Sequence, residues 1–180
     1  KWGFTHDRLM PNADDIRRTK EWAELDHVID VREYYRNNGS EQEIIKIVSL
    51  ENRKFGSVIE KLLREIYNLS KPESSKHDAI FVRFGRPNTK LEIKAARYWA
   101  GTKNCKWQHL EPGYDYTHIL FVLVDFNRLR GWCANKTPLF NENILTPQGK
   151  QGYWGDMDTL LASGHLTEVR NEAELSALLP

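Results

Sequence analysis

Cysteine is scarce in this sequence: only Cys105 and Cys133 occur among 180 residues. Two cysteines are too few for the disulfide framework of a small secreted scaffold. Neither lies in a CxxC pair or forms a zinc-binding pattern with the six histidines. We therefore expect two reduced thiols in a cytoplasmic protein whose stability comes from a hydrophobic core.

Long hydrophobic runs are also missing. No apolar stretch reaches the ~18 residues that a membrane span needs, so we expect no membrane partner. No internal repeat, low-complexity tract or linker divides the chain, and its length suits one domain better than two. With 40% hydrophobic and 28% charged residues, the composition is that of an ordinary globular protein. We expect a single domain over residues 1–180.

A large net charge is the third absence, because the formal charge is only +1. The positive charge is unevenly distributed, however, and the segment 83–106 holds many basic residues and one acidic residue, Glu92. The basic residues of this stripe are Arg83, Arg86, Lys90, Lys94, Arg97, Lys103 and Lys106. A local basic stripe on a nearly neutral protein suits a phosphate backbone. A solvated strand and loop would explain the same charges equally well.

Helical spacing of apolar residues is clearest over residues 55–69, which predicts an amphipathic helix there. Nearer the start, Asn12 could cap a long helix over residues 13–35 that ends at an Asn-Asn-Gly turn. Residues 141–180 are expected to contain a Gly- and Gln-rich loop and C-terminal helices. Asn171 and Glu174 have the spacing of a capping box before the last helix.

Between residues 77 and 134 the pattern changes to that of strands. Residues 77–84 and 91–99 alternate with period two around a turn at 85–88, and residues 129–134 form a further segment. The run 118–126 is nearly all apolar, as expected of a central strand buried on both faces. We expect residues 100–116 to be irregular or partly helical. The fold class is therefore α/β, with a four- or five-stranded mixed sheet flanked by helices.

Two neighbouring strands carry the candidate chemistry. Alternation along residues 90–94 places Glu92 and Lys94 on one face, about 7 Å apart, with Leu91 and Ile93 on the other. If the hairpin folds about the turn at 85–88, Asp78 lies opposite Glu92 on the same face. Two carboxylates could then share Mg²⁺, and an ammonium could orient a water molecule. A slip of one residue in this register would break the site.

The order of an acidic helix residue, Asp78, and the Glu92-Ile93-Lys94 triplet resembles the PD-(D/E)xK nuclease superfamily, which includes many type II restriction endonucleases. The resemblance covers residues 50–134, which would form the catalytic core, and Glu60 is the matching helix acid. It implies one or two Mg²⁺ ions on Asp78, Glu92 and the Ile93 carbonyl, with Glu60 as a further candidate ligand. Lys94 would activate water, and cleavage of DNA would leave a 5′ phosphate and a 3′ hydroxyl.

Each of these residues also has a simpler interpretation. Glu92 and Lys94 could form a solvated ion pair, and Asp78 could be an ordinary residue at a strand edge. Glu60 lies four residues before Arg64, so a surface ion pair on the helix competes with a catalytic role. The family pattern is also imperfect, because His77 stands where its name expects proline.

Candidate DNA contacts lie outside the carboxylate cluster. Arg97 and Lys103 belong to the basic stripe, and Gln148, Lys150 and Gln151 lie in the Gly-rich loop, where glutamine could bond adenine in the major groove. The simpler interpretation of that loop is a flexible surface segment. His77 and His109 are candidate proton carriers by residue type, and Tyr98 and Trp99 are expected to be core or edge aromatics.

The sequence thus predicts a Mg²⁺-dependent endonuclease that acts on double-stranded DNA, with a sequence-specific restriction enzyme as the leading hypothesis. One active site cuts one strand, so a homodimer with two-fold symmetry would suit a palindromic DNA site. The predicted N-terminal helix is a candidate dimer element. A repair or junction-resolving nuclease of the same fold, and a DNA-binding module without catalysis, remain alternatives.

Overall fold

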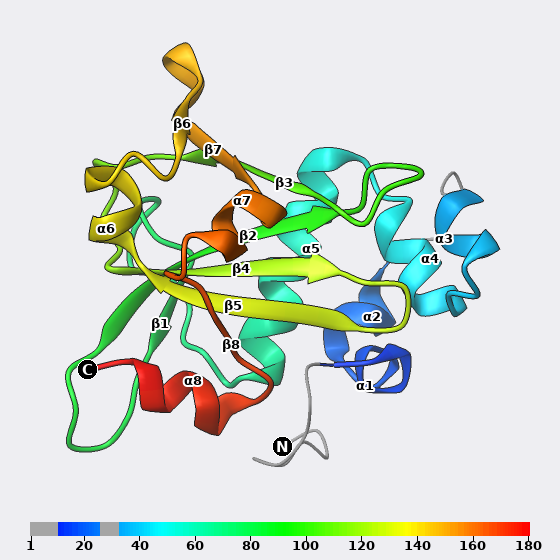
Figure 1. The fold of residues 1–180 in the computed structure, drawn as a ribbon. Coiled ribbons are helices and arrows are strands. Elements are labelled where there is room, and N and C mark those ends of the chain that lie inside the picture. Colours follow the sequence, from blue (N-terminus) through cyan, green and yellow to red (C-terminus); the bar gives the residue numbers. More distant parts are fainter. Residues whose placement is uncertain (1–10, 26–32) are drawn as a thin grey trace.

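The centre of the molecule is a five-stranded mixed sheet (Figure 1). The structure, a computed structural model, describes residues 11–25 and 33–180. In spatial order the strands are β1 (Ala79–Phe81), β2 (Thr89–Arg97), β4 (His118–Val124), β5 (Leu129–Asn135) and β8 (Thr167–Glu168). Strands β2 and β4 run parallel, while the other neighbouring pairs run antiparallel. The predicted α/β fold with a mixed sheet is confirmed.

Strand β4 is the most deeply buried strand of this sheet. All seven of its residues are buried, as expected of a strand that is covered on both faces and flanked by β2 and β5. The prediction of a central strand at residues 118–126 is therefore confirmed. This burial gives β2, which runs beside β4, a rigid support.

A second, three-stranded sheet was not predicted from the sequence. It contains β3 (Lys106–Leu110), β7 (Tyr153–Asp156) and β6 (Thr146–Pro147), in that spatial order. The prediction that residues 100–116 are irregular or partly helical was wrong for β3. The predicted loop at 146–155 contains residues of two short strands, on either side of the 3₁₀ turn η1 (Gly149–Gln151). A β-bulge between Trp107 and Leu110 shifts the pairing of β3 with β7 and breaks the period-two pattern.

The predicted long N-terminal helix was wrong. Asn12 does cap a helix, but α1 (Ala13–Arg17) is followed by α2 (Lys20–Glu24), and α3 is Glu33–Asn37. Thr19 separates the first two helices because its extended backbone and side chain cap α2 by accepting a hydrogen bond from Trp22 N. Residues 26–32 lie outside the described part of the chain, and helix α4 (Gln42–Val48) follows α3.

The long helix α5 (Asn52–Ile66) confirms the amphipathic pattern and packs against β2. The Glu51 side chain caps its start by accepting hydrogen bonds from the amides of Arg53 and Lys54. The apolar face of α5 is buried in the core and includes Phe55, Val58, Ile59, Leu62, Leu63 and Ile66. This packing fixes the orientation of α5 relative to β2.

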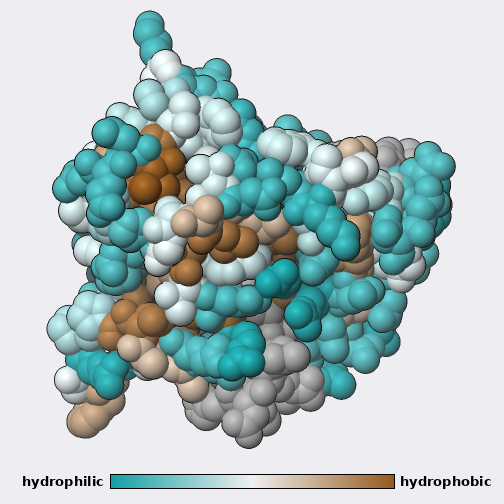
Figure 2. Space-filling view, viewed as in Figure 1, coloured by the Kyte–Doolittle hydropathy of each residue, from teal (hydrophilic) through white to brown (hydrophobic). Residues whose placement is uncertain are grey.

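The C-terminal part consists of α6 (Lys136–Asn141), α7 (Met157–Ala162) and α8 (Glu172–Leu178). The predicted cap is present, since the Asn171 side chain accepts a hydrogen bond from Glu174 N. Within residues 11–25 and 33–180, none of the helices has the length and apolar character needed to cross a membrane. Figure 2 shows a mainly hydrophilic face on which hydrophobic residues form small separate areas.

Candidate active site

Asp78 lies immediately before β1 and forms hydrogen bonds with the backbone of Leu91 and Ile93, the two neighbours of Glu92. Its amide donates to the Leu91 carbonyl at 2.8 Å, and its Oδ2 accepts from the Ile93 amide at 2.8 Å. The β1–β2 register, in which Ala79 pairs with Leu91, continues in this direction. The structure therefore brings Asp78 to the Glu92 position of β2, as the sequence pattern predicted.

Helix α5 supplies a second carboxyl group, that of Glu60. Burial, the negative charge of Asp78 and a hydrogen bond with the Asp78 side chain together raise the pKa of Glu60 to about 7. The nearby Arg64 guanidinium acts in the opposite direction on the same pKa. Arg64 also donates to the backbone carbonyl of Asp78 at 3.0 Å, which ties α5 to the start of β1.

Glu92 is the most buried of the three carboxyl groups, with 4% of its surface exposed. Burial, the charge of Asp78 and a hydrogen bond with Asp78 together raise its pKa to about 8. Asp78 thus lies between Glu60 and Glu92 and interacts with both. Three acidic side chains from α5, the β1 start and β2 share one small region.

Lys94 is the cationic neighbour of this cluster. Its Nζ lies 3.5 Å from Glu92 Oε2, and the ammonium lowers the pKa of both Glu92 and Glu60. The contact between Glu92 and Lys94 considered from the sequence is therefore present, but it is not a solvated ion pair, because Glu92 is buried and its raised pKa favours the protonated form at neutral pH. One ammonium beside three acidic groups leaves an excess of negative charge whenever all three are ionised.

The donor set fits a hard divalent cation. Carboxylate and carbonyl oxygens are the ligands that Mg²⁺ prefers, and such a cation would offset the repulsion that raises the pKa values of Glu60 and Glu92. In an antiparallel ladder the N–H and C=O of one residue point to the same side. Since the Ile93 amide points at Asp78, its carbonyl faces that edge too.

In their present positions, however, the acidic side chains do not form a ready-made cage. Among the described residues, no group of three or more His, Cys, Asp or Glu side chains is arranged to hold a metal ion. A site made of Asp78, Glu92 and one backbone carbonyl contains two such side chains, and Mg²⁺ commonly keeps several water ligands. The residues are compatible with a metal that is bound partly through water.

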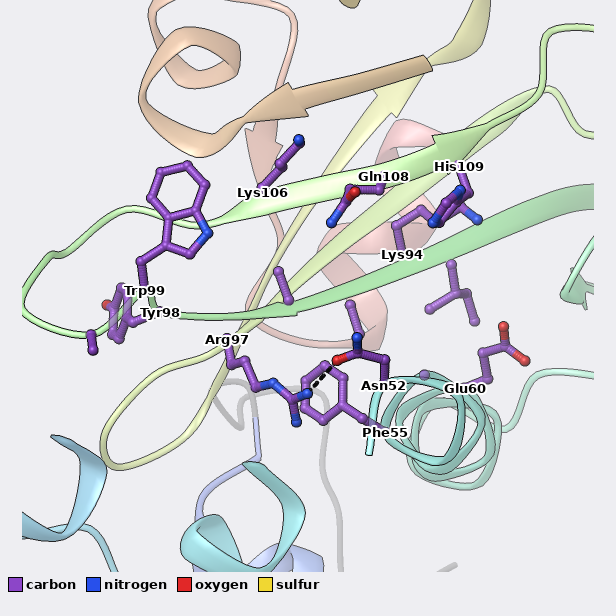
Figure 3. Close-up of a pocket in the computed structure, with 15 residues that line it drawn as sticks. Asn52, Phe55, Glu60, Lys94, Arg97, Tyr98, Trp99, Lys106, Gln108 and His109 are labelled. Atoms are coloured by element: carbon purple, nitrogen blue, oxygen red, sulfur yellow. Dashed lines mark hydrogen bonds between the residues drawn. The ribbon is translucent and has the colours of Figure 1, made fainter. Parts of the chain in front are cut away.

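A cleft of about 460 Å³ opens beside Glu60 and Lys94, between α5, β2 and β3 (Figure 3). Its lining is mostly polar, and its cationic residues are Lys94, Arg97 and Lys106, against one acidic residue, Glu60. Asn52, Gln108 and His109 add hydrogen-bonding groups, and Trp99 lies at the end far from Glu60 in Figure 3. The carboxyl cluster therefore lies at one end of a groove whose excess positive charge is complementary to an anionic chain.

His109 lines this cleft and has an unusual backbone conformation. Its φ of 62° lies in the left-handed region, and it is located at the β3 bulge. Its Nδ1 lies 3.3 Å from the Gln151 carbonyl, a contact that favours a proton on Nδ1. His77 is different, because it is buried and its Nε2 accepts the Glu73 amide, so it stabilises the preceding turn.

The predicted DNA contacts of the basic stripe differ in their surroundings. The Arg97 guanidinium donates to the carbonyls of Val48 and Leu50 and to Asn52 Oδ1, so it ties β2 to the α4–α5 connection while lining the cleft. Lys103 is exposed in the β2–β3 connection. Arg97 has a clear structural role, and contact of either residue with DNA stays a prediction.

The predicted recognition loop lies next to the cleft. Gln148, Lys150 and Gln151 belong to the turn between β6 and β7, which projects from the top of the molecule in Figure 1. The carbonyl of Gln151 lies against His109, which itself lines the cleft. Lys150 and Gln151 are exposed, whereas Gln148 is half-buried. The fold therefore joins this loop to the site, although its contact with bases stays a prediction.

Sequence reasoning missed three features of the cleft. Trp99, expected to be a core or edge aromatic, is 46% exposed and lines the cleft, while its neighbour Tyr98 is buried. Lys106 and Gln108 line it as well, from the unforeseen strand β3. The signal for Lys106 was its place in the basic stripe. The signal for Trp99 was its place directly beyond the Glu92–Lys94 strand.

Comparison with known proteins gives no relative for this chain at the family or sequence level. No protein-family model matches the chain, and no curated protein sequence matches it.

Proposed function

We propose that the chain is a Mg²⁺-dependent endodeoxyribonuclease of the PD-(D/E)xK type that hydrolyses phosphodiester bonds of double-stranded DNA, with a type II restriction endonuclease as its closest functional model. The observation that supports this proposal most strongly is that Glu60, Asp78 and Glu92 lie together. They lie beside Lys94 at the end of a cationic cleft. Buried carboxyl groups that raise one another's pKa are costly to a fold, and active sites are where such clusters concentrate.

Asp78, Glu92 and the Ile93 carbonyl would hold one or two Mg²⁺ ions, with Glu60 as a further ligand. A bound Mg²⁺ supplies Lewis acidity, which neutralises charge on the phosphate and lowers the pKa of a coordinated water. Lys94 would orient the attacking water and stabilise negative charge that develops at the phosphate oxygens. Hydrolysis would break the P–O3′ bond, leaving a 5′ phosphate and a 3′ hydroxyl.

Lys94 offers the sharpest test of this chemistry. Plasmid and linear duplex DNA are incubated with the protein in Mg²⁺ or in EDTA, using wild type, Lys94→Ala and the control Lys61→Ala. Lys61 is exposed on α5, so its loss leaves the carboxyl cluster unchanged. We expect Mg²⁺-dependent cleavage that falls about 100- to 1,000-fold in Lys94→Ala, the range for loss of one preorganised charge-stabilising group.

The products of the same experiment, with a branched DNA added as a third substrate, separate the related functions. Discrete bands indicate a sequence-specific enzyme, a smear indicates a nonspecific nuclease, and cleavage of branched but not linear DNA indicates a junction or repair nuclease. Intact DNA in Mg²⁺ together with a gel shift would contradict the proposed catalysis and leave a DNA-binding module.

We further propose that the protein acts as a homodimer in the cytoplasm. Two sites related by a two-fold axis would cut both strands of a palindromic DNA site, which one site cannot do in a single encounter. The free thiols of Cys105 and Cys133 are both buried, which suits a reducing compartment. Light scattering of the purified protein should give twice the 21.1 kDa chain mass, and the monomer mass would contradict a stable dimer.

A further inference from the structure

Trp99 is a large aromatic side chain that the fold leaves unusually open. It is 46% exposed, although its neighbour Tyr98 is buried in the core with 8% exposed. Its backbone is fixed, because its amide donates to the Asn104 carbonyl at 3.2 Å and its carbonyl accepts from Thr102 N at 3.1 Å. An exposed indole on a fixed backbone is a preorganised contact surface.

The position of Trp99 relates it directly to the candidate active site. Trp99 and Lys94 line the same cleft and are joined by the last part of β2 (Figure 3). Since β2 ends at Arg97, five residues at the extended rise of about 3.3 Å give an upper limit of ~16 Å for the distance between their Cα atoms. A stacked nucleic-acid strand rises about 3.4 Å per nucleotide, so this span equals about five nucleotides, and fewer when the strand is extended.

The rest of the lining favours an anionic strand between these two residues. Lys106 and Gln108 project from β3 on one side, and Arg97 and Asn52 lie on the other. Lys106 Nζ also lies 4.1 Å from the centre of the Trp154 ring, which holds this cation beside the cleft. Positive groups along a groove with an aromatic platform are the usual combination in sites for unpaired nucleic acid.

We propose that the cleft binds one DNA strand in an unpaired conformation, with a base stacked on Trp99 within about five nucleotides of the phosphate at Lys94. Within a base-paired duplex each base is stacked between its neighbours, and its ring faces are not available to an indole. The preferred substrate is therefore a duplex with an unpaired stretch beside the cut, such as a splayed arm or a flap. This inference rests on the proposed nuclease function for the position of the cut, and it favours the branched DNA of a junction or repair nuclease over the palindromic duplex of a restriction enzyme.

Binding measurements test the platform separately from catalysis. Fluorescence anisotropy in Ca²⁺, without cleavage, compares a single strand, a splayed-arm duplex and a blunt duplex of random sequence. The proteins are wild type, Trp99→Ala, Trp99→Tyr and Phe84→Ala. Phe84 is a matched control because it is a fully exposed aromatic outside the cleft.

We expect Trp99→Ala to bind the single strand and the splayed arm about 5- to 150-fold more weakly, the equivalent of one lost base stack, with the blunt duplex unaffected. Trp99→Tyr should retain most of the affinity, and Phe84→Ala should match wild type. Equal affinities of Trp99→Ala and wild type for all three DNAs would overturn the inference. Equal losses for all three would overturn it too, because they would indicate a general structural role.

Cleavage with Mg²⁺ then separates the two proposals. If wild type cuts duplex DNA and Trp99→Ala cuts the splayed-arm and the blunt substrate each as fast as wild type does, the nuclease proposal stands and the stacking platform fails. If no DNA is cut but the single strand binds in a manner that depends on Trp99, the platform stands and the nuclease proposal fails.

Discussion

Replacing Glu92 by glutamine should stabilise the metal-free protein. Glu92 is almost fully buried, and burial together with the neighbouring Asp78 raises its pKa from the ordinary 4.5 to about 8. The folded chain therefore keeps a proton on this carboxyl group that the unfolded chain has released at neutral pH. Glutamine has nearly the same shape and carries no charge, so this penalty on folding disappears.

The sign and the size of the effect follow from proton linkage. Between pH 4.5 and about 8 the folded state binds more protons than the unfolded state at this residue, so wild-type stability falls as pH rises through this interval. Each pKa unit corresponds to about 1.4 kcal/mol. Some repulsion between Asp78 and Glu60 remains in the variant, and the Glu92–Lys94 ion pair is lost. We expect a net gain of about 1–2 kcal/mol at pH 8.

Thermal unfolding followed by circular dichroism in EDTA measures this gain. For a chain of this length the gain corresponds to a Tm rise of about 2–8 °C at pH 8 and to almost none at pH 4.5. Glu24→Gln, which changes an exposed carboxylate on α2, is the control and should leave Tm unchanged at both pH values. A Glu92→Gln protein that is less stable than wild type at pH 8 would refute the reasoning, since it would show that the carboxylate contributes to the metal-free fold.

Three further predictions concern the surroundings of the site. Arg97→Ala should lower the free energy of unfolding by about 1.5–3 kcal/mol in urea titrations, because it removes charged hydrogen bonds to the α4–α5 connection; an unchanged midpoint would contradict this. Gly152→Ala should cost about 2–4 kcal/mol, because φ is 75° and a Cβ would lie 2.7 Å from the Leu110 carbonyl oxygen; wild-type stability would show that the turn relaxes without cost. Gln148→Ala and Gln151→Ala together should alter the sequence preference of cleavage, and an unchanged preference would remove this loop from recognition.

The carboxyl cluster was predictable because it depends on local rules. Period-two alternation placed Glu92 and Lys94 on one face, and the antiparallel pairing of β1 with β2 placed Asp78 beside them. The buried strand β4 was equally visible, since a continuous apolar run is the pattern of a strand covered on both faces. Glu60 was the uncertain member, because helix periodicity alone could not decide between Arg64 and the sheet as its partner.

The cleft was not predictable because its walls depend on irregular backbone. The extra residue of the β3 bulge and the positive φ of His109 break the alternation by which a strand is recognised in sequence. The exposure of Trp99 depends in turn on the path of the β2–β3 connection, which no local pattern specified. The N-terminal helix was misjudged for a different reason: a single threonine cap at Thr19 outweighed the approximate helical spacing around it.

Direct measurement of metal binding tests the central claim. Titration calorimetry of Mg²⁺ into wild-type protein and into Asp78→Asn, with Asp158→Asn as an exposed acidic control on α7, reports whether this carboxylate holds the ion. We predict one or two Mg²⁺ per chain for wild type and the control, and loss of that binding in Asp78→Asn. Equal Mg²⁺ binding by Asp78→Asn and wild type, or none by either, would contradict the account.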